Sequence, residues 1–276
     1  MRIVVLSDNR KLDQSLESEH GLCIYIETEH YNCLLDTGAS DSFIRNATKL
    51  NISLIDVDYV FISHGHIDHI GGLPAFLELN KKAKIVLSRH TINQKFFSTR
   101  NGFRQISLNF DFSIYSDRLV FVDTEAVFRD EIRVFSSKTN KYPSSKANEN
   151  LLKDAGDGMK SDDFNHELVI CFGTEDLVVY TGCAHNGLLN ILNSISLSHT
   201  KKISYVLGGF HLLDSQMENK YENKNDIEQI AYILKNDYSQ TTFVTGHCTG
   251  DQAFNQLKKQ LNDQISLFYT GYSIII

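Results

Sequence analysis

Phe-Ile-Ser-His-Gly-His-Ile-Asp-His-Ile-Gly-Gly occupies residues 61–72. An apolar run leads into this stretch and two glycines close it, which predicts a strand that stops abruptly, a loop and then a helix. Imidazole nitrogens and carboxylate oxygens are the ligands that zinc, iron, manganese and cobalt take in proteins. Because no Cys-x-x-Cys pair lies nearby, the pattern indicates an open, hydrolytic site rather than a closed structural one. The stretch contains four such side chains within six positions: His64, His66, Asp68 and His69.

The pattern His-x-His-x-Asp-His behind a strand resembles the signature of the metallo-β-lactamase superfamily. A histidine-rich surface loop is the alternative, and four ligand-type residues behind a buried-type strand disfavour it. Further segments extend the resemblance in one order over nearly the whole chain, to the branch of the archaeal enzyme 7,8-dihydropterin-6-methyl-4-(β-D-ribofuranosyl)aminobenzene-5′-phosphate synthase. These segments are Asp36-Thr37-Gly38, Thr181-Gly-Cys-Ala-His185, Gly208-Gly-Phe-His211 and Gly246-His247-Cys-Thr-Gly250.

The resemblance implies an α/β fold, a four-layer αβ/βα sandwich in which two mixed β-sheets are flanked by helices. We expect residues 1–276 to form a single domain of this fold. Residues 136–165 show the weakest pattern of the chain, and a connection of that length is typically a lid, a binding loop or disorder. We therefore expect a lid or insertion loop at 136–165, over the active-site mouth or at an oligomer contact.

A sequence pattern that recurs along the chain points to the same site. Four predicted strands each end in a histidine flanked by glycine, and these are His64, His185, His211 and His247. In α/β architectures ligands gather at the strand ends. The four histidines are therefore expected to meet in one place.

The resemblance implies a site for two ions along one edge of the sandwich. The identity of the third ligand of the first ion stays open. His185 is our choice because it ends a strand next to the first pair, and His166 is the rival because other branches place that histidine before the same hairpin. In this assignment the first ion takes His64 and His66, and the second takes Asp68, His69 and His247.

The same resemblance raises the question of a role for three further residues. Relatives place a metal-bridging Asp where this chain has Cys183, which is either a thiolate ligand or a small buried residue. His211 has no counterpart in the simplest pattern, so it is a general acid, a phosphate contact or an extra ligand. Asp36 ends a strand and is expected to orient the ligand loop without touching metal.

The composition of the chain argues against some classes of binding partner. The formal charge of −7 is spread without long blocks of one sign, which argues against nucleic acid. No apolar run approaches the roughly 20 residues needed to span a bilayer, so no membrane partner is expected. The five cysteines are scattered, which favours a reducing cytoplasm over a disulfide framework. A small-molecule substrate is expected as partner, and a homo-oligomer is left open.

The predicted function is a metal-dependent hydrolase that acts on a small phosphate-bearing or heteroaromatic substrate through a metal-activated water. Asp68 and His211 are the candidate catalytic residues. The resemblance implies one or two divalent ions, zinc first, with iron or manganese as alternatives. Two other functions are kept: a pterin-pathway transferase similar to the synthase above, and an iron-binding sensor without turnover.

Overall fold

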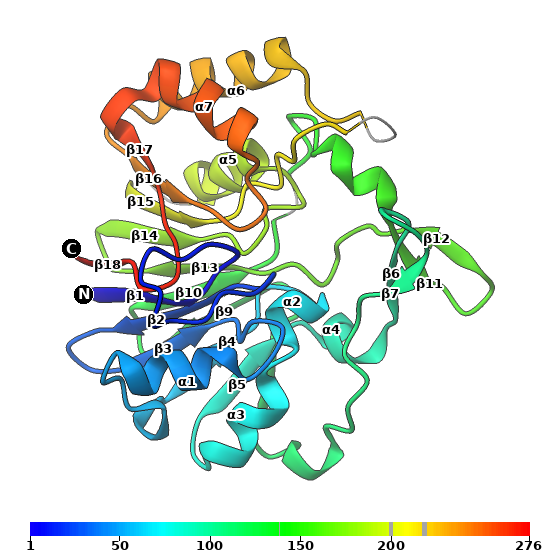
Figure 1. Cartoon of the computed structure of the whole chain (residues 1–276), viewed down its shortest axis with the longest axis vertical. Coiled ribbons are helices and arrows are strands. Elements are labelled where there is room, and N and C mark those ends of the chain that lie inside the picture. Colours follow the sequence, from blue (N-terminus) through cyan, green and yellow to red (C-terminus); the bar gives the residue numbers. More distant parts are fainter. Residues whose placement is uncertain (138, 199–200, 217–219) are drawn as a thin grey trace.

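The computed structural model describes residues 1–137, 139–198, 201–216 and 220–276. Two seven-stranded sheets lie face to face at its centre, with helices on the outer side of each (Figure 1). The first sheet is antiparallel from β18 to β3 and parallel from β3 to β8. Its strands, in spatial order, are β18 (Ser273–Ile275), β1 (Arg2–Ser7), β2 (Cys23–Glu27), β3 (Asn32–Leu35), β4 (Tyr59–Phe61), β5 (Lys84–Leu87) and β8 (Leu119–Phe121).

The second sheet is also mixed, parallel from β17 to β14 and antiparallel from β14 to β9. Its strands, in spatial order, are β17 (Ile265–Leu267), β16 (Thr242–Thr245), β15 (Lys202–Gly208), β14 (Asp176–Tyr180), β13 (Val169–Phe172), β10 (Ile132–Phe135) and β9 (Glu125–Phe128). The helices that cover it are α5 (Leu188–Ser198), α6 (Lys224–Asp237) and α7 (Asp251–Leu261).

The remaining helices lie on the side of the first sheet or near the loops at its edge (Figure 1). They are α1 (Ser42–Lys49), α2 (Ile67–Ile70), α3 (Leu73–Leu79) and α4 (Arg89–Asn93), with short 3₁₀ turns η1 (Leu54–Asp56), η2 (Ser113–Tyr115), η3 (Lys146–Asn150) and η4 (Asn262–Gln264). Among the described residues, no helix has the length and apolar character needed to cross a membrane.

The four layers follow from strands that are apolar on both faces. In β1, Ile3 and Val5 enter the core between the two sheets, whereas Val4 and Leu6 enter the core beneath the helices. Successive side chains of a strand point to opposite faces, so an unbroken apolar run fills two cores at once. The predicted four-layer αβ/βα sandwich with two mixed sheets is therefore confirmed.

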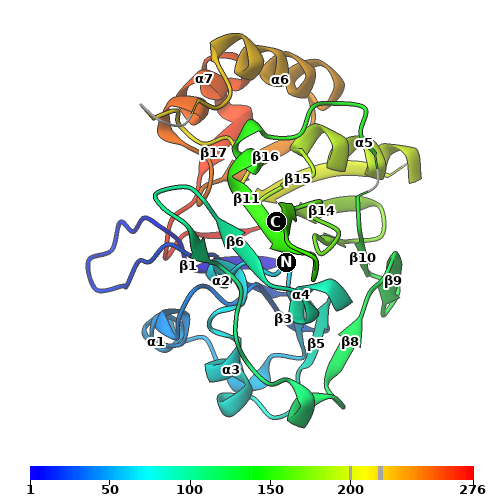
Figure 2. The same ribbon diagram turned by 90° about the vertical axis from the view of Figure 1, so that its right-hand side faces the viewer.

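A third sheet, which the sequence did not predict, stands at one side of the sandwich (Figure 1), and Figure 2 brings it to the front. Its four antiparallel strands are β12 (Met159–Ser161), β11 (Leu151–Asp154), β6 (Phe96–Ser98) and β7 (Arg104–Gln105). Two of them fall within 136–165, where a lid or insertion loop was expected; residue 138 of that stretch lies outside the described part. The strands form two short hairpins, and the pairing that joins them, β11 with β6, links residues some 50 positions apart, so no local pattern predicts the sheet. A lid role for this sheet stays a prediction.

Candidate metal centre

Four loops meet at one edge of the sandwich, after the carboxyl ends of β4, β14, β15 and β16. They bring together all four predicted strand-end histidines. The ring centroids of His64 and His185 are 4.9 Å apart, and those of His185 and His211 are 4.1 Å apart. His247 lies 4.8 Å from His69 by the same measure. Each of these histidines is at most 7% exposed.

Hydrogen bonds fix which ring nitrogens face the centre. Ser63 Oγ donates its one proton to Asp36 Oδ2 (2.6 Å), so it accepts a hydrogen bond from His64 Nδ1 (2.9 Å). Asn148 Nδ2 donates to the carbonyl of His185 (2.8 Å), which turns Asn148 Oδ1 toward His185 Nδ1 (3.1 Å). Both rings are therefore protonated at Nδ1 and carry a lone pair on Nε2. In the described part of the chain, these two buried Nε2 atoms have no hydrogen-bond partner.

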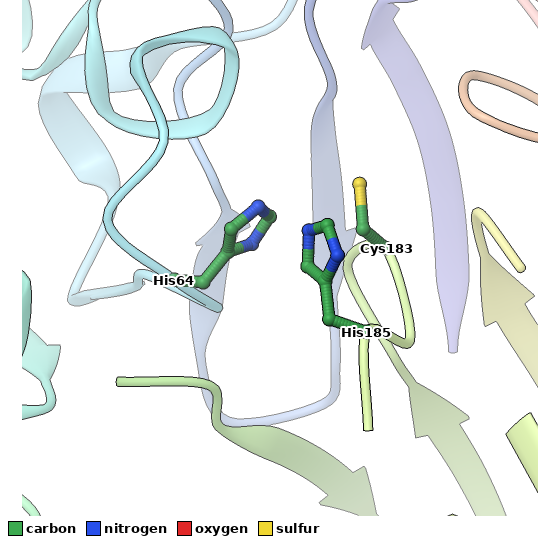
Figure 3. A group of neighbouring side chains, drawn as sticks. All are labelled: His64, Cys183 and His185. Carbon is green, nitrogen blue, oxygen red and sulfur yellow. The ribbon is translucent and has the colours of Figure 1, made fainter. Parts of the chain in front are cut away.

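The predicted ligands His64, His66 and His185 form the first candidate ligand group, although His66 also shares a donor cluster with Asp162 and His166. The ring of His66 lies 4.6 Å from that of His64 and 4.9 Å from that of His185. Figure 3 shows His64 on the loop after β4, with His185 and Cys183 across from it on the loop after β14. One donor atom from each of His64, Cys183 and His185 falls within 4.8 Å of the others. This spacing fits a single cation.

Burial sets the protonation state of the first group. It lowers the pKa of His66, and it holds the pKa of His64 and of His185 well below the usual histidine range. Neighbouring imidazoles act in the same direction, since each would repel a second positive charge. Neutral imidazole is the form that ligates metal. Buried lone pairs without a proton partner are costly unless something binds them, so this group fits a divalent ion.

The predicted ligands Asp68, His69 and His247 form the second candidate ligand group. Asp68 Oδ2 lies 3.3 Å from His247 Nε2, and the Nε2 atoms of His69 and His247 are 3.1 Å apart. Burial opposes the charge on Asp68, but His69 and His247 outweigh it and hold the pKa of that carboxyl well below its usual range. Burial likewise opposes charge on His247, and the hydrogen bond to Asp68 outweighs it and raises the pKa of His247 to about 9. This donor set also fits a divalent ion.

Cys183 lies where the two groups meet. Its Sγ is 3.2 Å from His69 Nε2, and it shares donor clusters both with His64 and His185 and with His69 and His247. Burial, together with the neighbouring Cys248, holds the pKa of the Cys183 thiol well above its usual range. The thiol is thus placed between the groups, as a shared ligand would be. Ligation by Cys183 stays a prediction.

Asp36 lies beneath the ligand loop with its carboxylate completely buried. Its Oδ1 accepts from the Ser63 amide (2.7 Å), and its Oδ2 accepts from His69 Nδ1 (2.6 Å) and from the Tyr180 hydroxyl (2.5 Å), besides the Ser63 hydroxyl. The bond to Nδ1 leaves the lone pair of His69 on Nε2, toward the centre. Asp36 thus bonds His69 on the side away from the centre, and its role in orienting a metal ligand stays a prediction.

The geometry separates the two rivals for the third ligand of the first ion. His166 Nδ1 accepts from the Gly65 amide (3.0 Å), and its Nε2 donates to Asp162 Oδ2 (3.1 Å). Both of its nitrogens are thus used within the protein. His185 keeps a free Nε2, so the arrangement favours His185.

Two buried carboxylates beside the first ligand group were missed by sequence reasoning. Asp162 Oδ2 holds His166 and lies 3.7 Å from His66 Nε2. Glu167 accepts from the amides of His185 (2.6 Å) and Asn186 (2.8 Å), which shapes the loop after β14. Burial raises the pKa of Glu167 to about 7. Asp162 sits in the stretch of weakest pattern and carried no signal, whereas Glu167 directly follows the rival His166.

This fold, with a histidine-rich donor cluster at one sheet edge, defines the class: the chain belongs to the metallo-β-lactamase superfamily. The family model named Metallo-beta-lactamase superfamily matches residues 18–133. The chain is similar to the solved structure of Tm1679, a metal-dependent hydrolase of the beta-lactamase superfamily, with a TM-score of 0.83 and 30% identity over 100% of this chain and 99% of that one.

A curated relative extends the comparison. The chain is 27% identical to 7,8-dihydropterin-6-methyl-4-(beta-D-ribofuranosyl)-aminobenzene-5'-phosphate synthase of Methanocaldococcus jannaschii, over 92% of this chain and 89% of that protein. A diphosphatase of the PhnP family, at 12% identity and a TM-score of 0.54, shares the fold alone. The resemblance to the metallo-β-lactamase superfamily and to this branch is confirmed.

Replacing His185 with alanine should lower the bound metal, whereas replacing His166 should not. His185 Nε2 is open to a ligand, but the His166 nitrogens are both bonded within the protein. We expect His166→Ala to lower the midpoint of urea unfolding and to retain metal. Elemental analysis of both purified variants measures the difference. Metal lost from His166→Ala and kept in His185→Ala would reverse the assignment.

Replacing Cys183 with serine should weaken metal binding about tenfold or more, since it removes a thiol placed between both ligand groups. The measurement is a metal-chelator competition titration, together with loss of the cobalt–thiolate absorption band in cobalt-loaded protein. Cys171→Ser is the matched control, because Cys171 is a buried thiol in β13 and in none of the donor clusters found among the described residues. An unchanged affinity and absorption spectrum would make Cys183 a packing residue.

Proposed function

We propose that the protein is a metal-dependent hydrolase acting on a small phosphate-bearing or heteroaromatic substrate. His64, His66 and His185 would hold one divalent ion, and Asp68, His69 and His247 a second, with Cys183 able to reach both. Zinc is the first choice because imidazole, carboxylate and thiolate are its usual ligands. One observation carries the proposal: buried imidazole lone pairs from separate strand ends converge without protein partners.

A divalent ion bound here would lower the pKa of a water molecule and polarise the bond under attack. Side chains of the protein would accept and release the protons of the reaction. Asp68 is 17% exposed at the cavity, and its Oδ2 lies 3.3 Å from Nε2 of the largely exposed His20. Asp68 Oδ2 would take up a proton, and His20 would pass it to solvent.

His211 is placed to supply a proton to a leaving group. Its side chain lines the same cavity, and both its ring nitrogens are buried without a partner among the described residues. The ring packs against that of His185, with the centroids 4.1 Å apart and the planes tilted by 57°, which keeps it beside the first ligand group. We propose His211 as the general acid of the reaction.

The cavity at this site has a volume of about 270 Å³, which suits a small molecule rather than a polymer. A pterin-pathway transferase is the second candidate. The likeness to the Methanocaldococcus jannaschii synthase along most of both chains favours it. The third is an iron-binding sensor, favoured by the two thiols of Cys183 and Cys248 beside His211.

The test begins with elemental analysis of protein purified without added metal. The protein is then assayed on phosphomonoesters, phosphodiesters and neutral esters in ¹⁸O-labelled water. We expect bound divalent metal and turnover with label in the product. Condensation of a pterin with an aminobenzene ribose phosphate, without hydrolysis, would replace the hydrolase with the transferase. Bound iron with a redox-linked spectrum and no turnover would replace it with the sensor.

A further inference from the structure

The cavity over the ligand groups has a second wall, built by the third sheet and its neighbours. Metal-ligand candidates line one side. The lining also includes Ser98, Arg100 and Arg104 from the β6–β7 hairpin, Asn150 at the end of η3 and Leu151 at the start of β11. The side-by-side placement of β6 and β11 is visible in Figure 2. The substrate cavity thus lies between the donor cluster and this wall.

The wall is positively charged in a protein of net charge −7. Arg100 and Arg104 are the two arginines that line the cavity, and Asp68 is its one carboxylate. Within the described ranges, neither arginine has a carboxylate at ion-pair distance. Five other arginines of the chain do have one: Arg2, Arg10, Arg45, Arg89 and Arg133.

Hydrogen bonds hold the hairpin that presents these two arginines. The Thr99 amide donates to the carbonyl of Asn150 (2.9 Å), and the Arg100 amide donates to Ser98 Oγ (3.2 Å). The Arg104 guanidinium donates to the Arg100 carbonyl, which draws the Arg104 side chain back along the turn. Asn150 is itself anchored, because its Oδ1 accepts from the Tyr221 hydroxyl (2.9 Å). The two guanidinium groups therefore stand on one braced turn at the cavity.

We propose that Arg100 and Arg104 bind a phosphate group of the substrate. A guanidinium presents paired donors that match two phosphate oxygens, and neither arginine spends its donors on a carboxylate, although Arg104 uses one of its five on the Arg100 carbonyl. The phosphate would sit against the third sheet while the bond to be broken lies at the histidines. This inference rests on the proposed function only for the statement that the bond at the histidines is the one that reacts. It makes phosphate a recognition group, distinct from the reacting bond.

The binding test uses the protein as purified, with adenosine 5′-monophosphate and adenosine as probes in isothermal titration calorimetry. We expect the phosphate compound to bind more tightly than adenosine. The double variant Arg100→Ala/Arg104→Ala should lose that difference, with binding weakened at least about tenfold, as expected for charge-assisted hydrogen bonds. Arg89→Ala is the matched control, since Arg89 faces Asp123 outside the cavity. Arg104→Gln, which keeps the bulk of the side chain, guards against a folding defect.

Failure of the phosphate-dependent binding would overturn the proposal, and so would a preference for carboxylate. The first would show as equal binding of adenosine 5′-monophosphate by wild type and double variant, or none by wild type. The second would show as tighter binding of adenosine 5′-carboxylate, which would make this a carboxylate site.

Kinetics separate this proposal from the proposed function. With 4-acetoxyphenyl phosphate, whose acetyl ester is the bond to be hydrolysed while its phosphate stays intact, the double variant should raise KM at least about tenfold and leave kcat within about twofold, because the arginines bind substrate without reacting. With the neutral 4-nitrophenyl acetate it should change neither. If no substrate is hydrolysed but the calorimetric difference is lost in the double variant, the hydrolase fails and the phosphate site stands. If hydrolysis proceeds with unchanged KM and unchanged binding, the phosphate site fails and the hydrolase stands.

Discussion

Replacing His66 with alanine is expected to strip metal from the protein and to lower kcat/KM by more than about 100-fold. Loss of a residue that merely orients a ligand costs up to that much, and loss of a ligand should cost more. His66 supplies a buried ring to the first group, within 5 Å of both partner rings by the centroid distances of 4.6 and 4.9 Å. Metal per chain is measured by elemental analysis, and turnover on the ester that the wild-type protein cleaves best.

His90→Ala is the control for this variant. His90 is an exposed histidine on the short helix α4, outside the donor clusters of the described residues, so it should leave metal content and turnover unchanged. Full metal content with full turnover in His66→Ala would refute the site.

Replacing Asp36 with alanine is expected to have the second largest effect, on stability and metal together. It leaves the Ser63 hydroxyl, the Tyr180 hydroxyl and His69 Nδ1 buried without their acceptor. Removing one partner of a buried, hydrogen-bonded pair costs about 3–5 kcal/mol of unfolding free energy. Metal affinity should fall about 10–100-fold, since His69 loses the bond that aims its Nε2. Urea unfolding measures the first effect and chelator competition the second.

Asp263→Ala, at a fully exposed carboxylate, is the control and should change neither quantity. If Asp36→Ala does not fold, Asp36→Asn keeps the volume of the side chain and one acceptor oxygen, and should still weaken metal binding. An unfolding free energy and metal affinity equal to wild type would leave Asp36 without the predicted role.

The site could be outlined from sequence because its parts follow a local rule. His64, His185, His211 and His247 each come directly after a strand, and the carboxyl ends of parallel strands share an edge. That rule joins the loops after β14, β15 and β16, which lie in the second sheet, and the family resemblance predicted that the loop after β4 of the first sheet would meet them. Asp36 was found in the same way, since it ends β3, the neighbour of β4.

Other parts of the site depend on contacts that no local pattern reports. Sequence spacing left His166 and His185 as rivals; the hydrogen bonds to Gly65 and Asp162 separated them. Asp162 itself lies in a stretch without clear periodicity. The partners concerned are up to 101 positions apart, so their pairing appears only once the chain is folded.

By itself, then, the sequence determined the donor-rich edge, because the ligand chemistry of imidazole and carboxylate is carried by short segments, and the four-layer fold followed from the resemblance of those segments to the metallo-β-lactamase superfamily. Tertiary structure alone decided which nitrogens stay free, where Cys183 lies between the two ligand groups, and that a third sheet sets Arg100 and Arg104 across the cavity. These features arise from the satisfaction of buried hydrogen bonds and from the pairing of distant short strands, and both depend on the whole chain at once.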